Sequence, residues 1–116
     1  MISLYENILK STGSGKKAKV SEKYFLEKGF HKTREGGAFE IVLPGGHYYY
    51  LYPWKDKWYV KIPRIEKGII QDTKHFVKTY EDFDLVMDYW NAVSNKLPSD
   101  VIKQKKELVK NTLERF

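Results

Sequence analysis

Two aromatic runs dominate the sequence, HYYYLYPW at residues 47–54 and KWYVKI at residues 57–62, and only Lys55-Asp56 separates them. A two-residue connection of this kind is typical of a β-hairpin, so we predict that the runs pair as antiparallel strands. Successive side chains of a strand point to opposite faces of a sheet, and each run therefore contributes to two surfaces. The first surface is apolar and is predicted to belong to the core: it consists of Tyr49, Leu51, Trp58, Val60 and Ile62.

The second surface of the hairpin carries more aromatic rings than one small core needs, and lysines lie between them. We call this surface the aromatic face, and its predicted members are Tyr48, Tyr50, Tyr52, Trp54 and Tyr59 together with Lys57 and Lys61. The turn sets a register in which Trp54 lies opposite Lys57, Tyr52 opposite Tyr59 and Tyr50 opposite Lys61. A surface of this composition is typical of a binding platform.

Short apolar segments between glycine-rich turns surround the hairpin. Turns are predicted at Glu35-Gly36-Gly37 and Pro44-Gly45-Gly46, because glycine and proline favour turn conformations. Residues 69–80 are ambiguous, and residues 75–80 are the better candidate for a last strand. The predicted strands are residues 30–34, 38–43, 47–54, 58–64 and 75–80, which form an antiparallel meander.

Helical periodicity marks both ends of the chain. Before the sheet we predict two short helices, over about residues 2–10 and residues 22–28. After it we predict a helix that begins at Asp82 and a C-terminal helix over about residues 99–116, capped by Ser99. The apolar stripe of the first is Phe83, Val86, Met87, Trp90 and Val93, and that of the second is Val101, Ile102, Leu108, Val109, Thr112, Leu113 and Phe116. The predicted fold class is α+β, an antiparallel four- to five-stranded meander with the two C-terminal helices packed on one face.

The composition limits the class of protein. A length of 116 residues suits a single domain, residues 1–116, with one core. No cysteine is present, which excludes disulfide bonds and thiolate metal sites and permits a reducing compartment. The first residues lack the pattern of an export signal, and no segment is long and apolar enough to span a membrane. We therefore expect a cytoplasmic protein with no membrane partner.

The net charge of +6 is concentrated before the C-terminal helices, and lysine supplies all but three of the 21 basic residues. A basic flexible loop is predicted over about residues 11–20, and it contributes Lys16, Lys17 and Lys19. Its glycines are similar to those of a phosphate-binding loop, but Lys10 and Lys17 stand where that motif needs a glycine and a Ser or Thr. We expect this loop to contact phosphates through backbone amides and lysines alone, and the alternative is a solvated connector.

No catalytic or metal-binding motif is present in the sequence. His31, His47 and His75 lie in separate segments without the spacing of a metal site, and the serines lack a nucleophile-elbow pattern. The clustered carboxylates of the helix predicted at Asp82 suit a solvated helix face better than an acid-base pair. We therefore predict no catalytic residues, no metal and no cofactor. The enzymatic alternative is a basic endoribonuclease that assembles histidine, lysine and tyrosine in space.

Aromatic rings beside lysines offer stacking planes for bases and positive charge for the phosphate backbone. We therefore predict a small non-enzymatic module that binds nucleic acid, with single-stranded DNA or RNA favoured, through the aromatic face and the lysines of the basic loop. Lysine is a point charge rather than a bidentate reader, so backbone attraction is expected to exceed base reading. The alternative is a protein-protein interaction module, an inhibitor or adaptor of the type that phages and mobile elements carry, which docks the same face on a protein. An exposed apolar C-terminal helix would also support a homodimer.

Two partial resemblances to known families exist, and neither is sufficient to assign one. Residues 53–62 followed by residues 78–82 are similar to the three-strands-then-helix layout of AP2-type DNA-binding domains, but the chain lacks their sheet arginines and the glycine before the helix. Residues 25–30 with Arg34 and Gly36-Gly37 look a little like the opening of HicA-type toxin ribonucleases. That family has a histidine after the glycine, where this chain has Ala38-Phe39. The sequence therefore assigns no family.

Overall fold

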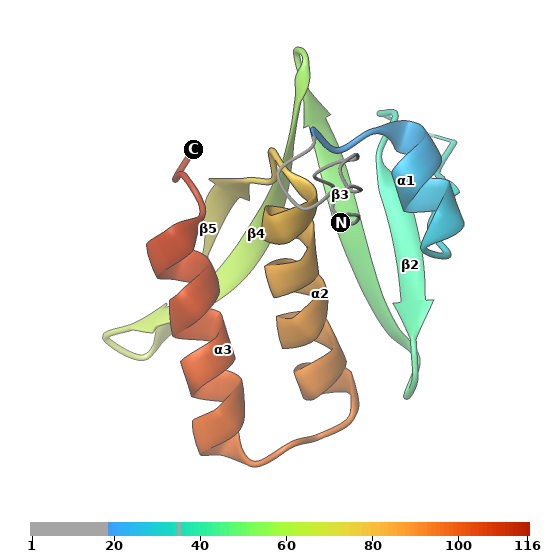
Figure 1. The fold of residues 1–116 in the computed structure, drawn as a ribbon. Coiled ribbons are helices and arrows are strands. Elements are labelled where there is room, and N and C mark those ends of the chain that lie inside the picture. The colour runs from blue at the N-terminus through green and yellow to red at the C-terminus, as the bar shows by residue number, and fades with distance from the viewer. Residues whose placement is uncertain (1–18, 35) are drawn as a thin grey trace, which may run out of the picture.

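The computed structural model describes residues 19–34 and 36–116. Within them, five strands form one antiparallel sheet in the order β1-β2-β3-β4-β5, and one short helix precedes the sheet while two longer helices follow it (Figure 1). The strands are β1 (His31–Lys32), β2 (Phe39–Leu43), β3 (His47–Trp54), β4 (Lys57–Glu66) and β5 (Ile69–Phe76). The helices are α1 (Glu22–Glu27), α2 (Tyr80–Ser94) and α3 (Ser99–Thr112).

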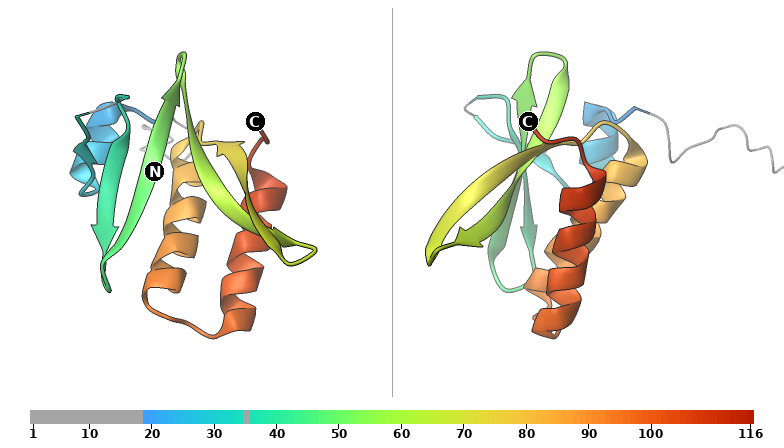
Figure 2. Two further views of the ribbon diagram at one scale, coloured as in Figure 1. Left: turned by 180° about the vertical axis from the view of Figure 1, so that it is seen from behind. Right: turned by 90° about the vertical axis from the view of Figure 1, so that its left-hand side faces the viewer.

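The helices α2 and α3 lie side by side against one face of the sheet, as both views of Figure 2 show. Leu51, Val60 and Ile62 point to this side from the central strands, and each is fully buried. Phe25 of α1 stacks on Phe83 of α2, with ring centroids 5.6 Å apart. This contact packs α1 and α2 into the same core. Full burial of one such side chain is worth roughly 1.5–3 kcal/mol, so this layer supplies the main driving force for folding.

The structure confirms the predicted hairpin and its faces. Tyr52 pairs with Tyr59, and Trp54 pairs with Lys57, as the turn chemistry requires. The third predicted pair, Tyr50 with Lys61, is wrong: the β3–β4 pairing ends at Tyr52 and Tyr59, because the two strands separate beyond these residues around a hollow that Tyr50 and Lys61 both line. Lys55 adopts a positive φ of 57° in this turn, which a residue other than glycine rarely does. Leu51, Val60 and Ile62 are buried, and Tyr49 and Trp58 pack against them half-buried. The α+β class and the antiparallel meander are therefore correct.

The last strand lies elsewhere than predicted. We expected it over residues 75–80, but β5 starts at Ile69 and ends at Phe76. A second tight hairpin connects it to β4, because Lys67 and Gly68 both adopt a positive φ, 53° and 78°. The next residues leave the sheet, and Thr79 caps the following helix. The sequence near Lys67 lacks the usual Asn-Gly or Asp-Gly signal, so the turn was missed.

Both C-terminal helices differ from the prediction at their ends. Helix α2 begins at Tyr80 rather than at Asp82, because the Thr79 hydroxyl and the Asp82 carboxylate form a capping box around the first turn. Helix α3 begins at Ser99, but its N-cap is Pro98, whose side chain makes no capping hydrogen bond, so Ser99 is not the cap that we predicted. The helix ends at Thr112, so the predicted continuation through residue 116 is wrong.

The apolar stripe of α3 is narrower than predicted. Val109 and Leu113 are buried, whereas Leu108 is 50% exposed. Adjacent residues of a helix lie about 100° apart around its axis, so Leu108 and Val109 cannot both face the sheet. The helix predicted over residues 2–10 lies outside the described residues, and α1 is the second predicted helix.

Candidate functional site

The aromatic face is the side of the sheet that points away from the helices. In the described residues no helix covers it, and the left view of Figure 2 shows the sheet in front with α2 and α3 behind it. Seven of the predicted site residues lie on this face: Tyr48, Tyr50, Tyr52, Trp54, Lys57, Tyr59 and Lys61. Residues that we did not predict join it from β5, since Lys74 pairs with Lys61 and Phe76 pairs with Tyr59. Asp72 of β5 also lies on this face, where it lines a hollow together with Tyr50, Tyr52 and Lys61.

The rings of the aromatic face form a connected row. Tyr52 and Tyr59 stack across the β3–β4 pair, with centroids 5.2 Å apart and planes at 21°. Tyr50 lies 5.9 Å from Tyr52 along the same strand. The two ends of the row are the most open, because Tyr48 is 58% exposed and Trp54 is 46% exposed.

Lysine ammonium groups lie over these rings. Nζ of Lys61 is 4.6 Å from the centre of the Tyr52 ring, and Nζ of Lys74 is 5.4 Å from that of Tyr59. Lys55 in the turn holds its Nζ 5.8 Å from the Trp54 ring. A cation over an aromatic ring is attracted by the electron-rich face, by about 0.5–1 kcal/mol at exposed sites. The lysines are therefore held where an anion bound beside the rings would meet them.

The β1–β2 end of this face has a different chemistry. Glu40 of β2 lies 2.8 Å from His31 Nε2 and accepts a hydrogen bond from the Tyr50 hydroxyl. This hydrogen bond is the main cause that raises the pKa of Tyr50 above its ordinary value of 10.0. Val42, 49% exposed, lies beside Tyr48 at the end of the row. The lysines therefore gather over the β3–β4 turn, β4 and β5, with Asp72 of β5 as an acidic neighbour of Lys61, and the opposite end is acidic or apolar.

The C-terminal residues complete the other end of the face. The backbone N–H of Phe76 donates to the backbone carbonyl oxygen of Glu114, and the N–H of Phe116 donates to that of Lys74, both at 2.8 Å. This pairing places the Phe116 ring 5.2 Å from Trp54, 5.0 Å from Tyr59 and 5.0 Å from Phe76. We had assigned Phe116 to a helical stripe, and no local signal in residues 113–116 marks an edge pairing with β5.

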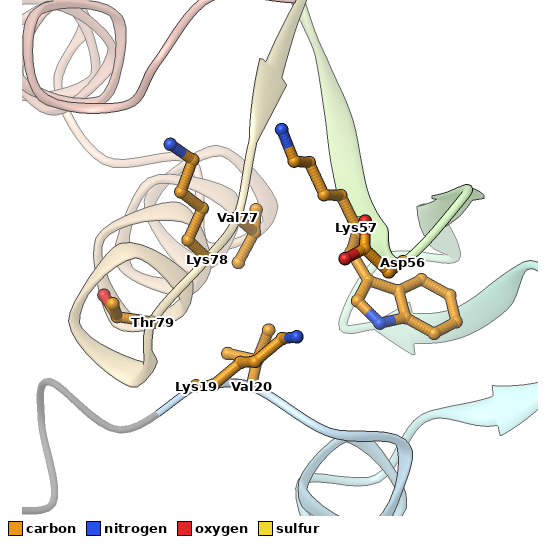
Figure 3. A pocket seen from close by; sticks show the side chains of 8 residues that line it. Lys19, Val20, Asp56, Lys57, Val77, Lys78 and Thr79 are labelled. Carbon is orange, nitrogen blue, oxygen red and sulfur yellow. The ribbon is translucent and has the colours of Figure 1, made fainter.

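The predicted basic loop contributes one described lysine, because Lys16 and Lys17 lie outside the described residues. Lys19 is exposed, and its backbone bridges to Thr79 rather than to a strand of the aromatic face. It lines a cavity of about 360 Å³ together with Lys57 and Lys78 (Figure 3). In the described residues, Lys19 is therefore linked to the aromatic face through Lys57, which lines this cavity and also lies on the aromatic face.

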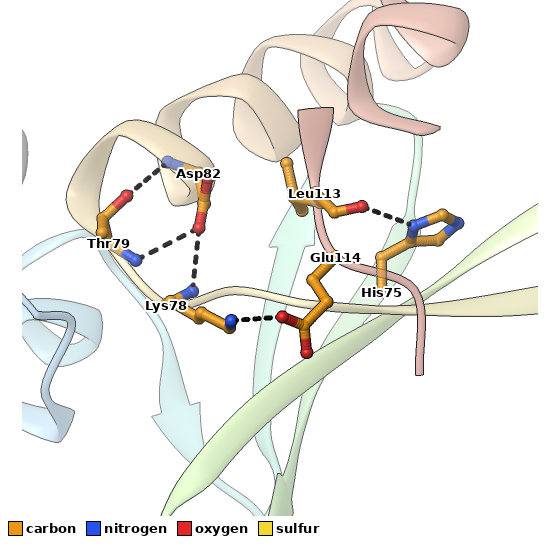
Figure 4. A network of polar contacts seen from close by, with 6 residues as sticks. All are labelled: His75, Lys78, Thr79, Asp82, Leu113 and Glu114. Atoms are coloured by element: carbon orange, nitrogen blue, oxygen red, sulfur yellow. Dashed lines mark hydrogen bonds and ion pairs between the residues drawn. The ribbon is translucent and has the colours of Figure 1, made fainter. Parts of the chain in front are cut away.

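The three histidines do not come together. His31 lies on the aromatic face, and His47 stacks on Tyr49 on the helix side. His75 is buried beneath the C-terminal segment, with Nδ1 3.4 Å from the Leu113 carbonyl oxygen (Figure 4). Burial is the main cause that lowers the pKa of His75 below 6.5. In residues 19–34 and 36–116, no group of three His, Asp or Glu side chains is arranged to hold a metal ion.

Comparison with known proteins gives no relative. None of the helices in the described part of the chain is long and apolar enough to span a bilayer. No protein-family model, no curated protein and no solved structure matches this chain.

Proposed function

We propose that this protein is a non-enzymatic module that binds single-stranded nucleic acid through the aromatic face. The observation that carries the proposal is the stacked pair of Tyr52 and Tyr59, each with a lysine ammonium group over its ring. A nucleotide presents the two matching groups, a planar base and a phosphate. The base takes the place of the ammonium group over the ring, and the flexible lysine moves aside to the phosphate.

The spacing of the rings favours a single strand over a duplex. Rings recur at every second residue of β3, which is a step of about 6.5–7 Å along the strand. The bases of a duplex are about 3.4 Å apart and are turned inward, so their faces are not available to such a row. An extended single strand exposes each base and matches the longer step. Each productive stack is worth about 1–3 kcal/mol, so two or three of them give micromolar affinity together with the backbone attraction.

The charges of the site favour binding that tolerates many sequences. Lys57, Lys61 and Lys74 supply the positive groups on the aromatic face, and no arginine lies among its members. Lysine attracts a phosphate as a point charge, but it lacks the bidentate hydrogen bonds by which arginine recognises the edge of a guanine base. We therefore propose affinity for the backbone and for stacked bases of any kind, in a cytoplasmic protein that needs no cofactor.

Fluorescence anisotropy of labelled single-stranded DNA, RNA and duplex DNA tests this proposal at low and at physiological salt. We expect single strands to bind best, and the affinity to fall as salt rises. Tyr52→Ala is expected to weaken binding by about fivefold to 150-fold, the loss of one stacking platform. Tyr80→Ala is the matched control, because this ring stacks on Tyr24 on the helix side. A folded protein that binds no oligonucleotide at low salt refutes the proposal, and cleaved RNA at the end of the assay would indicate the endoribonuclease instead.

A protein target is the second candidate, and the Val42 and Tyr48 end of the row favours it. Both side chains are about half exposed, and apolar contact surface of this kind is typical of protein interfaces. An inhibitor or adaptor that docks here would form a complex little affected by salt, and Trp54→Ala would cost about 2 kcal/mol or more. Light scattering of the purified protein tests the remaining candidate partner, a second copy of the chain.

A further inference from the structure

A cavity of about 360 Å³ lies where the β3–β4 turn, the end of β5 and the start of α2 meet (Figure 3). Backbone hydrogen bonds build its walls. The N–H of Val20 donates to the backbone carbonyl oxygen of Lys78 at 3.1 Å, and the N–H of Val77 donates to that of Trp58 at 2.8 Å. The cavity is therefore fixed by three segments far apart in the sequence, and it is not a gap between surface side chains.

The inner walls of this cavity are apolar. Val20 and Val77 are almost completely buried, with exposed fractions of 6% and 1%. The Trp58 ring is held edge-to-face against Phe25 and Phe39, with centroids 5.1 Å and 5.5 Å away. Such walls bind a flat apolar group such as a nucleobase, because burial of its faces removes apolar area from water.

The rim of the cavity is cationic. Lys19, Lys57 and Lys78 come to it from three different segments, and among the described residues Asp56 is the acidic one that lines it (Figure 3). Lys78 is paired with Glu114, with Nζ and Oε1 2.5 Å apart, and this pair lowers the pKa of Glu114 (Figure 4). An apolar interior below a cationic rim fits an anion whose body is a flat ring.

The cavity also lies at one end of the aromatic row. Lys57 pairs with Trp54, the last ring of β3, and the same lysine lines the cavity. Small-molecule pockets span about 300–1,000 Å³, so this one has room for a single nucleotide and not for a longer segment. The cavity walls lie on the helix side of the sheet, so a strand that follows the row towards Trp54 reaches them by turning around the β3–β4 hairpin at Lys57, with one nucleotide left to place.

We propose that this cavity takes the terminal nucleotide of the bound strand, with the base between Trp58 and the valines and a terminal phosphate on Lys19 and Lys78. This inference rests on the proposed function, because it gives the strand on the aromatic face a defined end. A phosphate at the end of the strand carries more charge than an internal one and is not shared with a following nucleotide. The protein therefore binds the end of a strand in the cavity as well as unpaired bases on the aromatic face.

The test uses one short single-stranded oligonucleotide in three forms: 5′-phosphorylated, 3′-phosphorylated and without a terminal phosphate. We expect one phosphorylated form to bind about tenfold more tightly than the form without a phosphate, the effect of one charge-assisted contact. The double variant Lys19→Gln/Lys78→Gln is expected to abolish this preference while it still binds the unphosphorylated strand. Glu114→Gln is expected to increase the preference, because it releases Lys78 from its partner.

The matched control is Lys103→Gln together with Lys23→Gln, which removes the same charge at α3 and α1, away from the cavity. Equal affinities for the three forms, or a preference that survives Lys19→Gln/Lys78→Gln, overturn the inference while the proposed function stands. If no form binds, the proposed function fails, and a titration with nucleoside monophosphates followed by tryptophan fluorescence decides on the cavity separately. A saturable change that the double variant loses supports the site, and no change overturns it.

Discussion

The ring of Phe116 stacks on the ring of Phe76, with centroids 5.0 Å apart and planes at 25°. The contact joins the C-terminal residue of the sequence to the last residue of β5. It buries Phe76, which is 8% exposed although it lies on the open side of the sheet. The C-terminal segment therefore extends one end of the aromatic face and supports the rings of Trp54 and Tyr59 beside it.

Phe116→Ala is expected to lower the free energy of unfolding by about 1–2 kcal/mol, because the aromatic contact and part of its buried area are lost. Urea denaturation measures the change. Leu108→Ala is the control, since Leu108 is similarly exposed on α3 but has no aromatic partner among the described contacts. Equal effects of the two substitutions would show that the aromatic contacts of Phe116 add no stability beyond that of a half-exposed apolar side chain.

Lys61→Gln is expected to reduce the salt dependence of single-strand binding. Each phosphate contact to a single strand contributes about 0.7 to the slope of log affinity against log salt concentration, and one contact is removed. Anisotropy titrations at four or more salt concentrations measure the slope. Lys23→Gln on α1 changes the net charge equally, so an identical slope change in both variants would argue against a phosphate contact at Lys61.

Stability is expected to fall when the pH drops below about 6.5, because of His75. Burial, aided by the charges of Arg115 and Lys110, lowers the pKa of this histidine in the folded protein. The unfolded chain therefore binds the proton first, so the stabilisation is complete above pH 6.5 and is lost as the pH falls towards the folded-state pKa. Urea denaturation at several pH values measures this loss. His75→Gln should flatten the profile, and an unchanged profile in this variant would contradict the assignment to His75.

Glu40→Gln is expected to move the pKa of Tyr50 back towards 10.0. The hydrogen bond to the Glu40 carboxylate is the largest cause of the raised pKa, and the charge of this group adds to it. A pH titration of the Tyr50 ring carbon by NMR measures the shift. The pKa of Tyr24, raised to about 12 mainly by burial, serves as the internal reference and should not change. A constant pKa for Tyr50 would mean that Glu40 is not its partner.

Local chemistry in the sequence was sufficient for the hairpin and its two faces. A two-residue turn fixes the register of the strands that it joins, and the period of two then fixes which side chains share a face. For that reason Tyr52 and Tyr59 were correctly paired, and Leu51, Val60 and Ile62 were correctly placed in the core. The turn at Lys67-Gly68 was not predicted, because its sequence signal is weak. The register of β5 therefore stayed unknown, and Lys74 and Phe76 were not predicted as members of the aromatic face.

The sequence by itself thus determined the α+β class, the aromatic face and the side of the hairpin that is buried, because these follow from turns and periodicity between near neighbours. Only the tertiary structure decided that the described helices leave the aromatic face open, that Phe116 packs at one end of the row, and that Lys19, Lys57 and Lys78 meet around one cavity. These contacts join residues up to about sixty positions apart. Their geometry depends on how the helices and the C-terminal segment pack on the sheet, and no local pattern of residues encodes that packing.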